Sequence, residues 1–297
     1  MPELPEVESV RRQLAPALVG RRFDRVAIDD ARLVRPYDPD AVAAELRGER
    51  VAAVERRGKY LVVRFESGRV LLIHLRMTGS LLHGARGSFQ DLPHRRAVVT
   101  LDDGSDVAYR DVRRFGTWLL LEPQEAEPYL GARVGDEPLE ALFTAARLGE
   151  RLAGRRTSLK AALLDQRTLA GMGNIYVDEA LWRARLNPLR IASSLDRTEL
   201  RRLHRGIRVA LEHGLARQGS TLRDYRLPDG SGGSMQDEFR VYGRRDEPCD
   251  RCGTSIARTQ VAGRTTWFCP TCQPAEDGQA ARRSSRRPSR SSRHSSV

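Results

Sequence analysis

The sequence predicts an α+β fold in two domains: an N-terminal β-sandwich with flanking helices, and a C-terminal helical bundle that carries a β-hairpin zinc finger. Three observations predict this fold. Residues 1–130 contain many short β-rich segments between turns. Helical periodicity takes over from about Glu137, and two pairs of cysteines follow near the end. The 297 residues are enough for two hydrophobic cores, and we place the break between them near 128–135.

The first domain, 1–130, is predicted to consist mainly of strands. One helix is expected at 6–18, where apolar residues recur at helical spacing, and another at 39–46. The strand segments are rich in β-branched or aromatic residues and are separated by Gly, Asp and Ser turns. These strands are expected at 51–55, 60–65, 70–75, 97–101, 106–110 and 117–121.

The next part of the chain, 136–225, is predicted to be a helical bundle. The Gly-rich stretch 169–174 fits a tight connection between two helices. Residues 219–236 are also rich in glycine and are predicted to form a mobile loop. The expected helices lie at 139–147, 148–152, 159–164, 175–184 and 198–218.

The four cysteines form two pairs, Cys249-x-x-Cys252 and Cys269-x-x-Cys272. This spacing is typical of a structural zinc site on two knuckles, because four thiolates complete the tetrahedral shell of one Zn²⁺. Disulfides are the weaker interpretation in a cytoplasmic protein. A closed shell has no open position for catalysis, so we expect the finger, 237–273, to be structural.

Between the cysteine pairs, the segments 257–261 and 265–268 alternate in polarity around a short turn. This pattern predicts a β-hairpin. The tip of the hairpin presents Arg264, which is well suited to bind phosphate.

A net charge of +12 and a pI near 10.3 predict a polyanionic partner, with nucleic acid ahead of an anionic membrane surface. No apolar run approaches the ~20 residues of a membrane-spanning helix. The acidic N-terminus lacks the apolar region of a secretory signal, so we expect a cytoplasmic protein. The tail, 274–297, is rich in Ser and Arg and is predicted to be disordered, either as a solvated extension or as a nonspecific DNA tether.

Only two of the 51 basic residues, Lys59 and Lys160, are lysines. Arginine is a fixed charge, whereas lysine is a compact ammonium that can titrate. The rarity of lysine therefore indicates a specific role at Lys59. At Lys160 a solvated charge is an equal alternative.

The first residues can carry covalent chemistry. Removal of Met1 would leave Pro2 as a free secondary amine, which can attack a sugar carbon and form an iminium. α-Amino groups titrate near ~8, compared with ~10.4 for lysine, so more of this amine is nucleophilic at neutral pH. Glu3 is one peptide bond away and is placed to move protons at the same centre.

Motifs along the whole chain resemble those of the bacterial formamidopyrimidine-DNA glycosylases, in the same order. Only the tail lies outside the resemblance. The resemblance implies that the bundle is a helix-two-turn-helix domain, and that a monomer binds double-stranded DNA containing oxidised bases or abasic sites. The motifs are MPELPEVE at 1–8, RGKYL at 57–61, HLRMTG at 74–79, DVRRFG at 111–116, GMGNIYVDE at 171–179 and the cysteine pairs.

The resemblance also implies the reaction. Oxidised purines (8-oxoguanine and formamidopyrimidines) are removed, and the abasic site is cleaved by β,δ-elimination through a Schiff base on Pro2. Glu3 helps the base to depart, while Lys59 and Arg264 assist strand cleavage. Because a guanidinium has a pKa above ~12, we expect Arg264 to act as a phosphate clamp rather than as an acid. The loop at 219–236 is expected to close over the extruded base.

Three residues, Met77, Arg113 and Phe115, match those that the family inserts into the duplex where the nucleotide leaves. Without the resemblance, Met77 and Phe115 would be interpreted as core residues. The resemblance assigns phosphate binding to Lys59, His94, Arg114, Arg156, Asn174 and Arg264. Lys160 is a further candidate DNA ligand, on equal terms with a solvated charge.

The residues themselves add something to two of these phosphate assignments, Asn174 and Arg156. Asn174 has a physical argument, because backbone amides at a helix start can hold a phosphate. Arg155 could serve as well as Arg156. Glu6 and Glu179 are interpreted as buried acids that orient the Pro2 amine.

Two other functions are compatible with the sequence. The first is an endonuclease VIII-type glycosylase for oxidised pyrimidines, although Leu4-Pro5, the Arg113-to-Phe115 group and the long loop favour the purine-directed branch. The second is a catalytically silent DNA-binding protein. The presence of both Pro2 and Glu3 argues against it, because a protein that only binds DNA needs neither.

Overall fold

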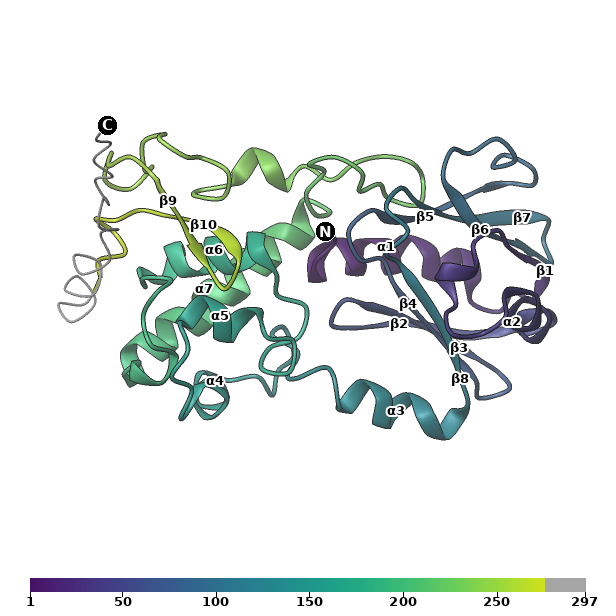
Figure 1. Cartoon of the computed structure of the whole chain (residues 1–297), viewed down its shortest axis with the longest axis horizontal. Helices are drawn as coiled ribbons and strands as arrows, with labels where there is room; N and C mark the ends of the chain where they lie inside the picture. The colour runs from purple at the N-terminus through teal and green to yellow at the C-terminus, as the bar shows by residue number, and fades with distance from the viewer. Residues whose placement is uncertain (276–297) are drawn as a thin grey trace, which may run out of the picture.

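The computed structural model describes residues 1–275, which fold into a β-sandwich and a helical bundle with a hairpin beside it (Figure 1). The predicted tail lies outside the described residues, apart from its first two positions. The first helix, α1 (Leu4–Leu18), runs along the sandwich, and its N-terminus lies at the junction with the bundle (Figure 1). Within the described range, no helix combines the length and the apolar character needed to cross a membrane.

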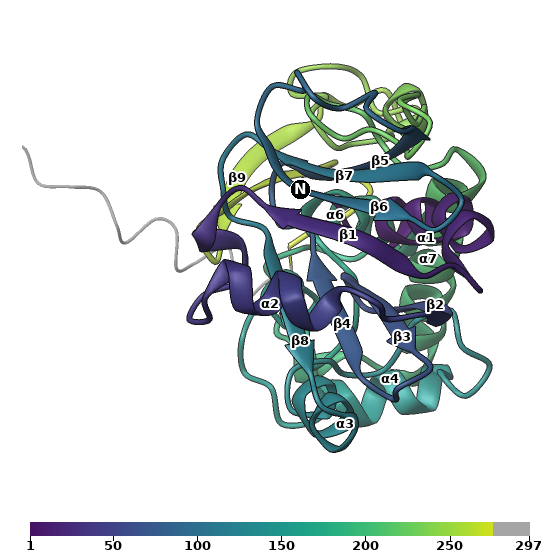
Figure 2. The same cartoon turned by 90° about the vertical axis from the view of Figure 1, so that its right-hand side faces the viewer.

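The N-terminal part is the predicted β-sandwich, built from two antiparallel four-stranded sheets that form separate layers (Figure 2). One sheet has the order β1 (Phe23–Ile28), β6 (Arg95–Leu101), β7 (Ser105–Asp111) and β5 (Gly79–Ala85). The other has the order β2 (Val51–Arg57), β3 (Tyr60–Phe65), β4 (Val70–His74) and β8 (Thr117–Leu121).

The core of the sandwich lies between the sheets and against α1. Apolar side chains such as Val63, Leu71 and Val99 are buried there with Leu14 of α1. The helix starts earlier than the predicted 6–18, because Glu3 caps it in a capping box and prolines are favoured in a first turn. The second predicted helix, 39–46, is confirmed as α2 (Pro39–Leu46).

Three elements of the first part were not expected from the sequence. Strands β1 and β5 are largely exposed or rich in small residues, so their hydrophobic pattern is weak. Helix α3 (Pro123–Gly131) ends the first part and overlaps the start of the break that was predicted near 128–135 (Figure 1). Its Ala126 and Leu130 pack on the outer face of the second sheet, against Leu72.

The second part contains the helices α4 (Ala145–Leu152), α5 (Leu159–Leu164), α6 (Asn174–Ala184) and α7 (Arg197–Ala216). The expected helix at 139–147 is wrong: residues 139–144 form turns, and the Thr144 side chain caps α4 by accepting a hydrogen bond from the Arg147 amide at 3.1 Å. The second part also contains two short 3₁₀ helices, η2 (Ala192–Ser194) and η3 (Met235–Glu238). A third, η1 (Ala31–Leu33), lies in the first part.

The predicted loop at 219–236 is present and bridges the two parts of the molecule. Its Tyr225 and Leu227 are buried in the core of the sandwich. The amide of His83 in β5 donates to the Pro228 carbonyl at 2.8 Å. Its mobility stays a prediction.

The predicted hairpin is confirmed as β9 (Ala257–Val261) and β10 (Arg264–Phe268). Both turn residues, Ala262 and Gly263, have positive φ, at 49° and 71°. This two-residue turn has the twist that closes antiparallel hairpins. It places Arg264 at the first position of β10, exposed to solvent.

Candidate active site

A pocket of about 370 Å³ opens at the N-terminus, where the two parts of the molecule meet. Pro2 is buried in its wall beneath the exposed Met1. The lining residues come from both parts and include Pro2, Glu6, Met77, Thr78 and Arg113 from the first, and Ile175, Ser220, Tyr225 and Tyr242 from the second. The site therefore exists only when the sandwich and the bundle are assembled.

The Glu3 carboxylate is buried at the start of α6. It accepts hydrogen bonds from the amides of Ile175 at 3.0 Å and Tyr176 at 3.3 Å. These are free N-terminal amides of a helix, which favour a negative charge. Two of the amides at this helix start, which were expected to hold a phosphate near Asn174, thus hold a side chain of the protein itself and are not free to bind one.

Gly173 makes the position of Glu3 possible. A Cβ at this residue would lie 2.3 Å from Cδ of Glu3 and 2.5 Å from its Oε1. Only a residue without a side chain leaves this space. The sequence showed the glycine as part of a motif, but its partner is 170 residues away and was not predicted.

Burial raises the pKa of Glu3, while Lys59 and the helix amide of Ile175 oppose the shift. A carboxyl group with a raised pKa retains its proton at higher pH and can donate it. Glu3 therefore has the environment of a general acid.

Lys59 lies in the turn between β2 and β3 and is only 6% exposed. Burial lowers its pKa, and the nearby carboxylates Glu3 and Glu6 partly oppose this shift, whereas Arg264 adds to it. A lysine with a lowered pKa exchanges protons closer to neutral pH than an exposed one. The structure thus brings Lys59, Glu3 and Arg264 into one electrostatic neighbourhood.

An unpredicted carboxylate holds the turn that carries Lys59. Glu137 accepts a hydrogen bond from the Gly58 amide at 2.5 Å and an ion pair from Arg56 at 2.8 Å. It lies in the segment between the sandwich and the bundle. Its position 79 residues from Gly58 left no local signal in the sequence.

Glu6 joins the start of α1 to the loop at 219–236. Its carboxylate accepts from the Glu3 amide at 2.9 Å, from the Tyr176 hydroxyl at 2.8 Å and from the Ser220 amide at 2.8 Å. The buried acid predicted at this position is present. Its bonds orient the backbone beside Pro2 and fix one end of the loop.

Glu179 has a different role from the one expected. One oxygen of its carboxylate accepts from three successive amides, those of Arg240, Val241 and Tyr242, at 2.9, 2.9 and 3.1 Å. The other pairs with Arg183 at 2.7 Å. Glu179 therefore anchors the segment that places Tyr242 in the pocket, and the interpretation that it orients the Pro2 amine is wrong.

Met77 and Arg113 line the pocket, and Phe115 is exposed close to Arg113 outside it. Phe115 is 51% exposed, which removes the interpretation of this residue as part of the core. The Arg113 guanidinium lies 4.6 Å from the centre of the Phe115 ring. Asp111, which was not assigned a role, fixes this loop: it accepts from the Gly116 amide at 2.7 Å and from the Thr78 hydroxyl.

The predicted phosphate ligands differ in their exposure to solvent and in whether their side chains already bind another group of the protein. His94, Arg156 and Arg264 are exposed. Arg155, the alternative to Arg156, is paired with Asp165 at 3.1 Å, which favours Arg156. The Asn174 side-chain amide is already engaged and donates to the Thr265 carbonyl at 2.9 Å.

Arg114 is held by a carboxylate of its own chain. Its guanidinium makes two hydrogen bonds to Asp30, at 2.6 and 2.8 Å, and 40% of its side chain remains exposed. Its backbone has a positive φ of 59°. Asp30 therefore fixes the direction of Arg114 next to Phe115.

Lys160 is neither solvated nor able to touch DNA, so both interpretations of it are wrong. It is completely buried, pairs with Asp178 at 2.7 Å and donates to the Thr265 carbonyl at 3.1 Å. Asp178 also accepts from the Trp267 amide at 3.1 Å. The pair fastens β10, and with it Arg264, to the helices α5 and α6.

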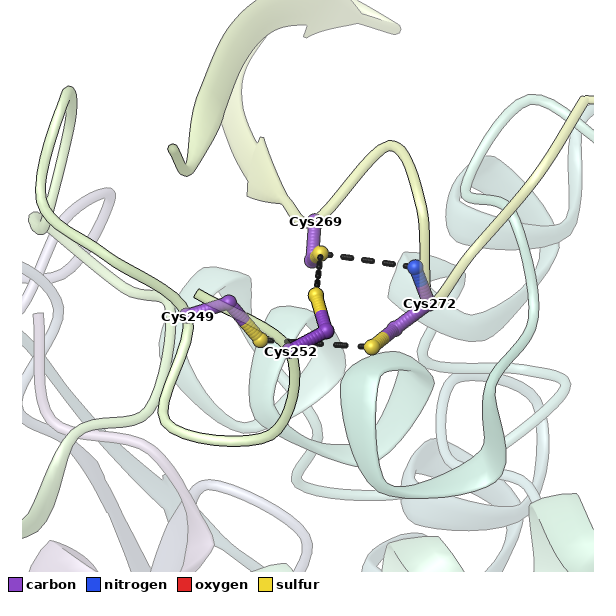
Figure 3. Close-up of side chains that lie close together, drawn as sticks. All are labelled: Cys249, Cys252, Cys269 and Cys272. Carbon is purple, nitrogen blue, oxygen red and sulfur yellow. Dashed lines mark hydrogen bonds between the residues drawn. The ribbon is translucent and has the colours of Figure 1, made fainter. Parts of the chain in front are cut away.

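The four cysteines lie together at the base of the hairpin (Figure 3). Their sulfur atoms are all within 4.8 Å of one another. A tetrahedral zinc ion with bonds of about 2.3 Å requires sulfurs that are about 3.8 Å apart. The donor set therefore fits one structural Zn²⁺, and Trp182 supports it by donating from Nε1 to the Cys249 sulfur at 3.4 Å.

Comparisons with known proteins cover nearly all of the described chain. Residues 1–118 match the formamidopyrimidine-DNA glycosylase N-terminal domain, 134–226 match its H2TH domain, and 246–275 match the zinc finger found in FPG and IleRS. The chain is 48% identical to the formamidopyrimidine-DNA glycosylase of Symbiobacterium thermophilum over 98% of this chain and 95% of that protein. It is 45% identical to that of Geobacillus kaustophilus over 92% of this chain and all of that protein.

Solved structures agree with these matches. The Lactococcus lactis FPG in complex with DNA containing an abasic site superimposes with a TM-score of 0.85 at 36% identity, covering 92% of this chain and all of that one. The MutM (FPG) protein of Thermus thermophilus gives a TM-score of 0.82 at 41% identity, with 93% and 100% covered.

Proposed function

Because the chain belongs to the formamidopyrimidine-DNA glycosylase family, we propose that it removes oxidised purines, 8-oxoguanine and formamidopyrimidines, from duplex DNA and then cleaves the abasic site. The observation that carries this function is that Pro2 lines a pocket between the two parts, while the buried Glu3 follows it in the chain and interacts electrostatically with the buried Lys59. A protein that only binds DNA has no need of a buried acid beside its N-terminal residue.

The reaction starts once Met1 has been removed and Pro2 carries a free secondary amine. The amine nitrogen attacks C1′ of the damaged nucleotide, the bond between C1′ and the base breaks, and the base leaves with a proton. Glu3 supplies the proton, since its raised pKa keeps the carboxyl group protonated at higher pH. The Pro2 nitrogen then loses its proton, and the C1′–O4′ bond breaks as O4′ takes up a proton, which leaves an iminium between Pro2 and the opened sugar.

Strand cleavage follows from the iminium. The iminium makes a C2′ proton acidic, and its loss expels the 3′ phosphate by β-elimination. Loss of a C4′ proton from the resulting conjugated iminium then expels the 5′ phosphate by δ-elimination. Lys59 moves protons in these steps, because burial lowers its pKa and so eases the release of its proton compared with an exposed lysine. Arg264 at the hairpin tip clamps a backbone phosphate and stays charged throughout.

The remaining residues hold the duplex in the extruded state. Met77, Arg113 and Phe115 fill the space that the nucleotide leaves, as apolar wedges do in other bent DNA. His94, Arg114 and Arg156 contact phosphates, which supply most of the affinity. Zinc holds the hairpin and takes no part in the chemistry.

We place the enzyme in the cytoplasm as a monomer. Its four cysteines are gathered for zinc, which requires reduced thiols, and reduced thiols are maintained in the cytoplasm.

A second substrate class has one specific observation in its favour. The Lactococcus lactis FPG has also been solved with DNA containing an oxidised pyrimidine, and it superimposes on this chain with a TM-score of 0.85. Oxidised pyrimidines are therefore the alternative substrates to test.

The test is borohydride trapping on a duplex that carries 8-oxoguanine opposite cytosine. The wild-type protein should give a covalent adduct whose linked peptide begins at Pro2, and Pro2→Gly and Glu3→Gln should lose most of it. Binding without any trapping would favour the silent DNA-binding protein. Trapping only on oxidised pyrimidines would favour the endonuclease VIII type.

A further inference from the structure

A second pocket, of about 560 Å³, adjoins the active-site pocket on the far side of Met1 and Met77, which line both. Its wall is made by Phe115 and by four arginine side chains: Arg32, Arg35, Arg76 and Arg114. Among the described residues, no acidic side chain lines it. The reaction at Pro2 does not use this pocket, so its charge requires another explanation.

Within residues 1–275, three of these arginines lack a counter-charge. Arg114 is paired with Asp30, whereas Arg32, Arg35 and Arg76 are exposed and form no ion pair within residues 1–275. Many other arginines of the chain are paired with carboxylates, as in the pairs of Arg64 with Glu55 and of Arg151 with Asp136. A cluster of unpaired guanidiniums raises the local positive potential and attracts phosphate.

The arginines come from separate segments that are held in place. Arg32 lies in η1, whose first turn is capped by Asp30, and Arg35 follows it. Arg76 has a positive φ of 52°, and its amide donates to Nδ1 of His74 at 3.0 Å. Asp30 caps η1 and also binds Arg114, so one buried carboxylate arranges both sides of the pocket.

The position of this second pocket, next to the active-site pocket and the wedge residues, indicates which ligand it binds. The active-site pocket receives the damaged nucleotide, and the wedge residues between the two pockets take its place in the duplex. The face beyond the wedge then lies against the strand that was paired with that nucleotide. This strand offers a row of phosphates and an unpaired base, which can stack on the exposed ring of Phe115.

We infer that Arg32, Arg35 and Arg76 bind backbone phosphates of the undamaged strand opposite the lesion. Asp30 is a positioning residue for this site, because its carboxylate caps η1, which carries Arg32, and holds the neighbouring Arg114. The inference rests on the proposed function, since it requires a duplex with one nucleotide extruded.

The test compares the triple variant Arg32→Gln, Arg35→Gln, Arg76→Gln with a control triple variant of equal charge, Arg25→Gln, Arg47→Gln, Arg205→Gln. The control arginines are exposed and line neither pocket. Binding to a duplex with a tetrahydrofuran abasic-site analogue is measured across salt concentrations. The first variant should reduce the slope of log K against log salt by about 0.9 for each phosphate that it no longer neutralises, hence by about 2.7 in all. The control should change the slope much less.

Neutral phosphates provide the reciprocal test. Methylphosphonate linkages opposite the lesion, in the undamaged strand, should weaken binding by the wild type and have little effect on the first variant. The first variant should also lose more affinity for the duplex than for the damaged strand alone. Equal behaviour of both triple variants, or equal sensitivity of the wild type and the first variant to methylphosphonates, would overturn the inference.

Failure of this inference and failure of the proposed function give different results. If the wild type is trapped by borohydride on damaged duplex but the two variants bind alike, only the inference fails. If the wild type is never trapped, the proposed function fails first.

Discussion

Replacement of Gly173 by alanine tests whether the position of the Glu3 carboxylate matters for catalysis. The new Cβ would lie 2.3 Å from Cδ of Glu3, whereas ordinary contacts between such atoms begin near 3.4 Å. The carboxylate must therefore retreat by about 1 Å, and a misplacement of about 1 Å can cost about 100-fold in rate. The move also weakens the bonds from Ile175 and Tyr176 to Glu3.

The backbone itself does not oppose this change. Gly173 has φ −139° and ψ −162°, an extended conformation that alanine adopts freely. Gly→Ala at a permitted backbone position stabilises a protein by about 0.4–1 kcal/mol, through the unfolded state. The loss of activity should therefore far exceed any loss of stability.

The assay is single-turnover excision of 8-oxoguanine, with thermal unfolding followed in parallel. Gly131→Ala is the control, because a Cβ at Gly131, the last residue of α3, meets nothing within 4 Å. We expect excision to fall by about 100-fold in Gly173→Ala and to stay unchanged in Gly131→Ala. Wild-type excision by Gly173→Ala would refute the role of the Glu3 position.

Three further predictions follow from the structure. Phe115→Ala should weaken binding to a duplex that carries the lesion by about 5- to 150-fold, the equivalent of about 1–3 kcal/mol of base stacking. Its thermal stability should stay nearly unchanged, because the ring is half exposed. Equal affinity of the variant and the wild type in a fluorescence titration would contradict this prediction. Removal of zinc by a chelator, or Cys269→Ser, should release the hairpin and abolish DNA binding, while the sandwich stays folded. Metal content checks the loss of zinc, and circular dichroism checks that the sandwich is retained. Full DNA binding by the metal-free protein would show that the finger is dispensable. Hydrogen bonds from Arg151, and then from Arg147, lower the pKa of Asp136 to about 2, so its stabilising contribution is present above pH ~4 and is lost as the pH falls toward 2. Asp136→Asn should accordingly lower the urea midpoint at pH 7 but not at pH 2, and equal losses at both would rule out this ion pair as the cause.

The order of local elements was largely predictable from the sequence. The helix that contains Val7, Val10 and Leu14 repeats its apolar residues at helical spacing, and the hairpin before Cys269 alternates around a turn. Cysteine spacing identified the zinc ligands, because the two residues between each pair fix the reach of the thiolates. These features depend on neighbours within a few residues, and the sequence contains them directly.

The roles of single buried side chains depended on tertiary structure. Lys160 was distinctive in the sequence, but its partners Asp178 and Thr265 lie 18 and 105 residues away. The expected helix at 139–147 lost its first residues to turns. Helix α3 was not expected, and it forms because its apolar face packs on the second sheet.

The sequence alone therefore determined the fold class and the family, and it singled out the residues that we propose to react, since motifs and periodicity are local properties. Only the tertiary structure decided that Glu3 occupies the helix start at Gly173, that Glu179 anchors the segment at Tyr242, and that Lys160 is buried. The physical reason is that a buried charge requires partners from several segments. Folding brings those segments together, and no local pattern records which of them will meet.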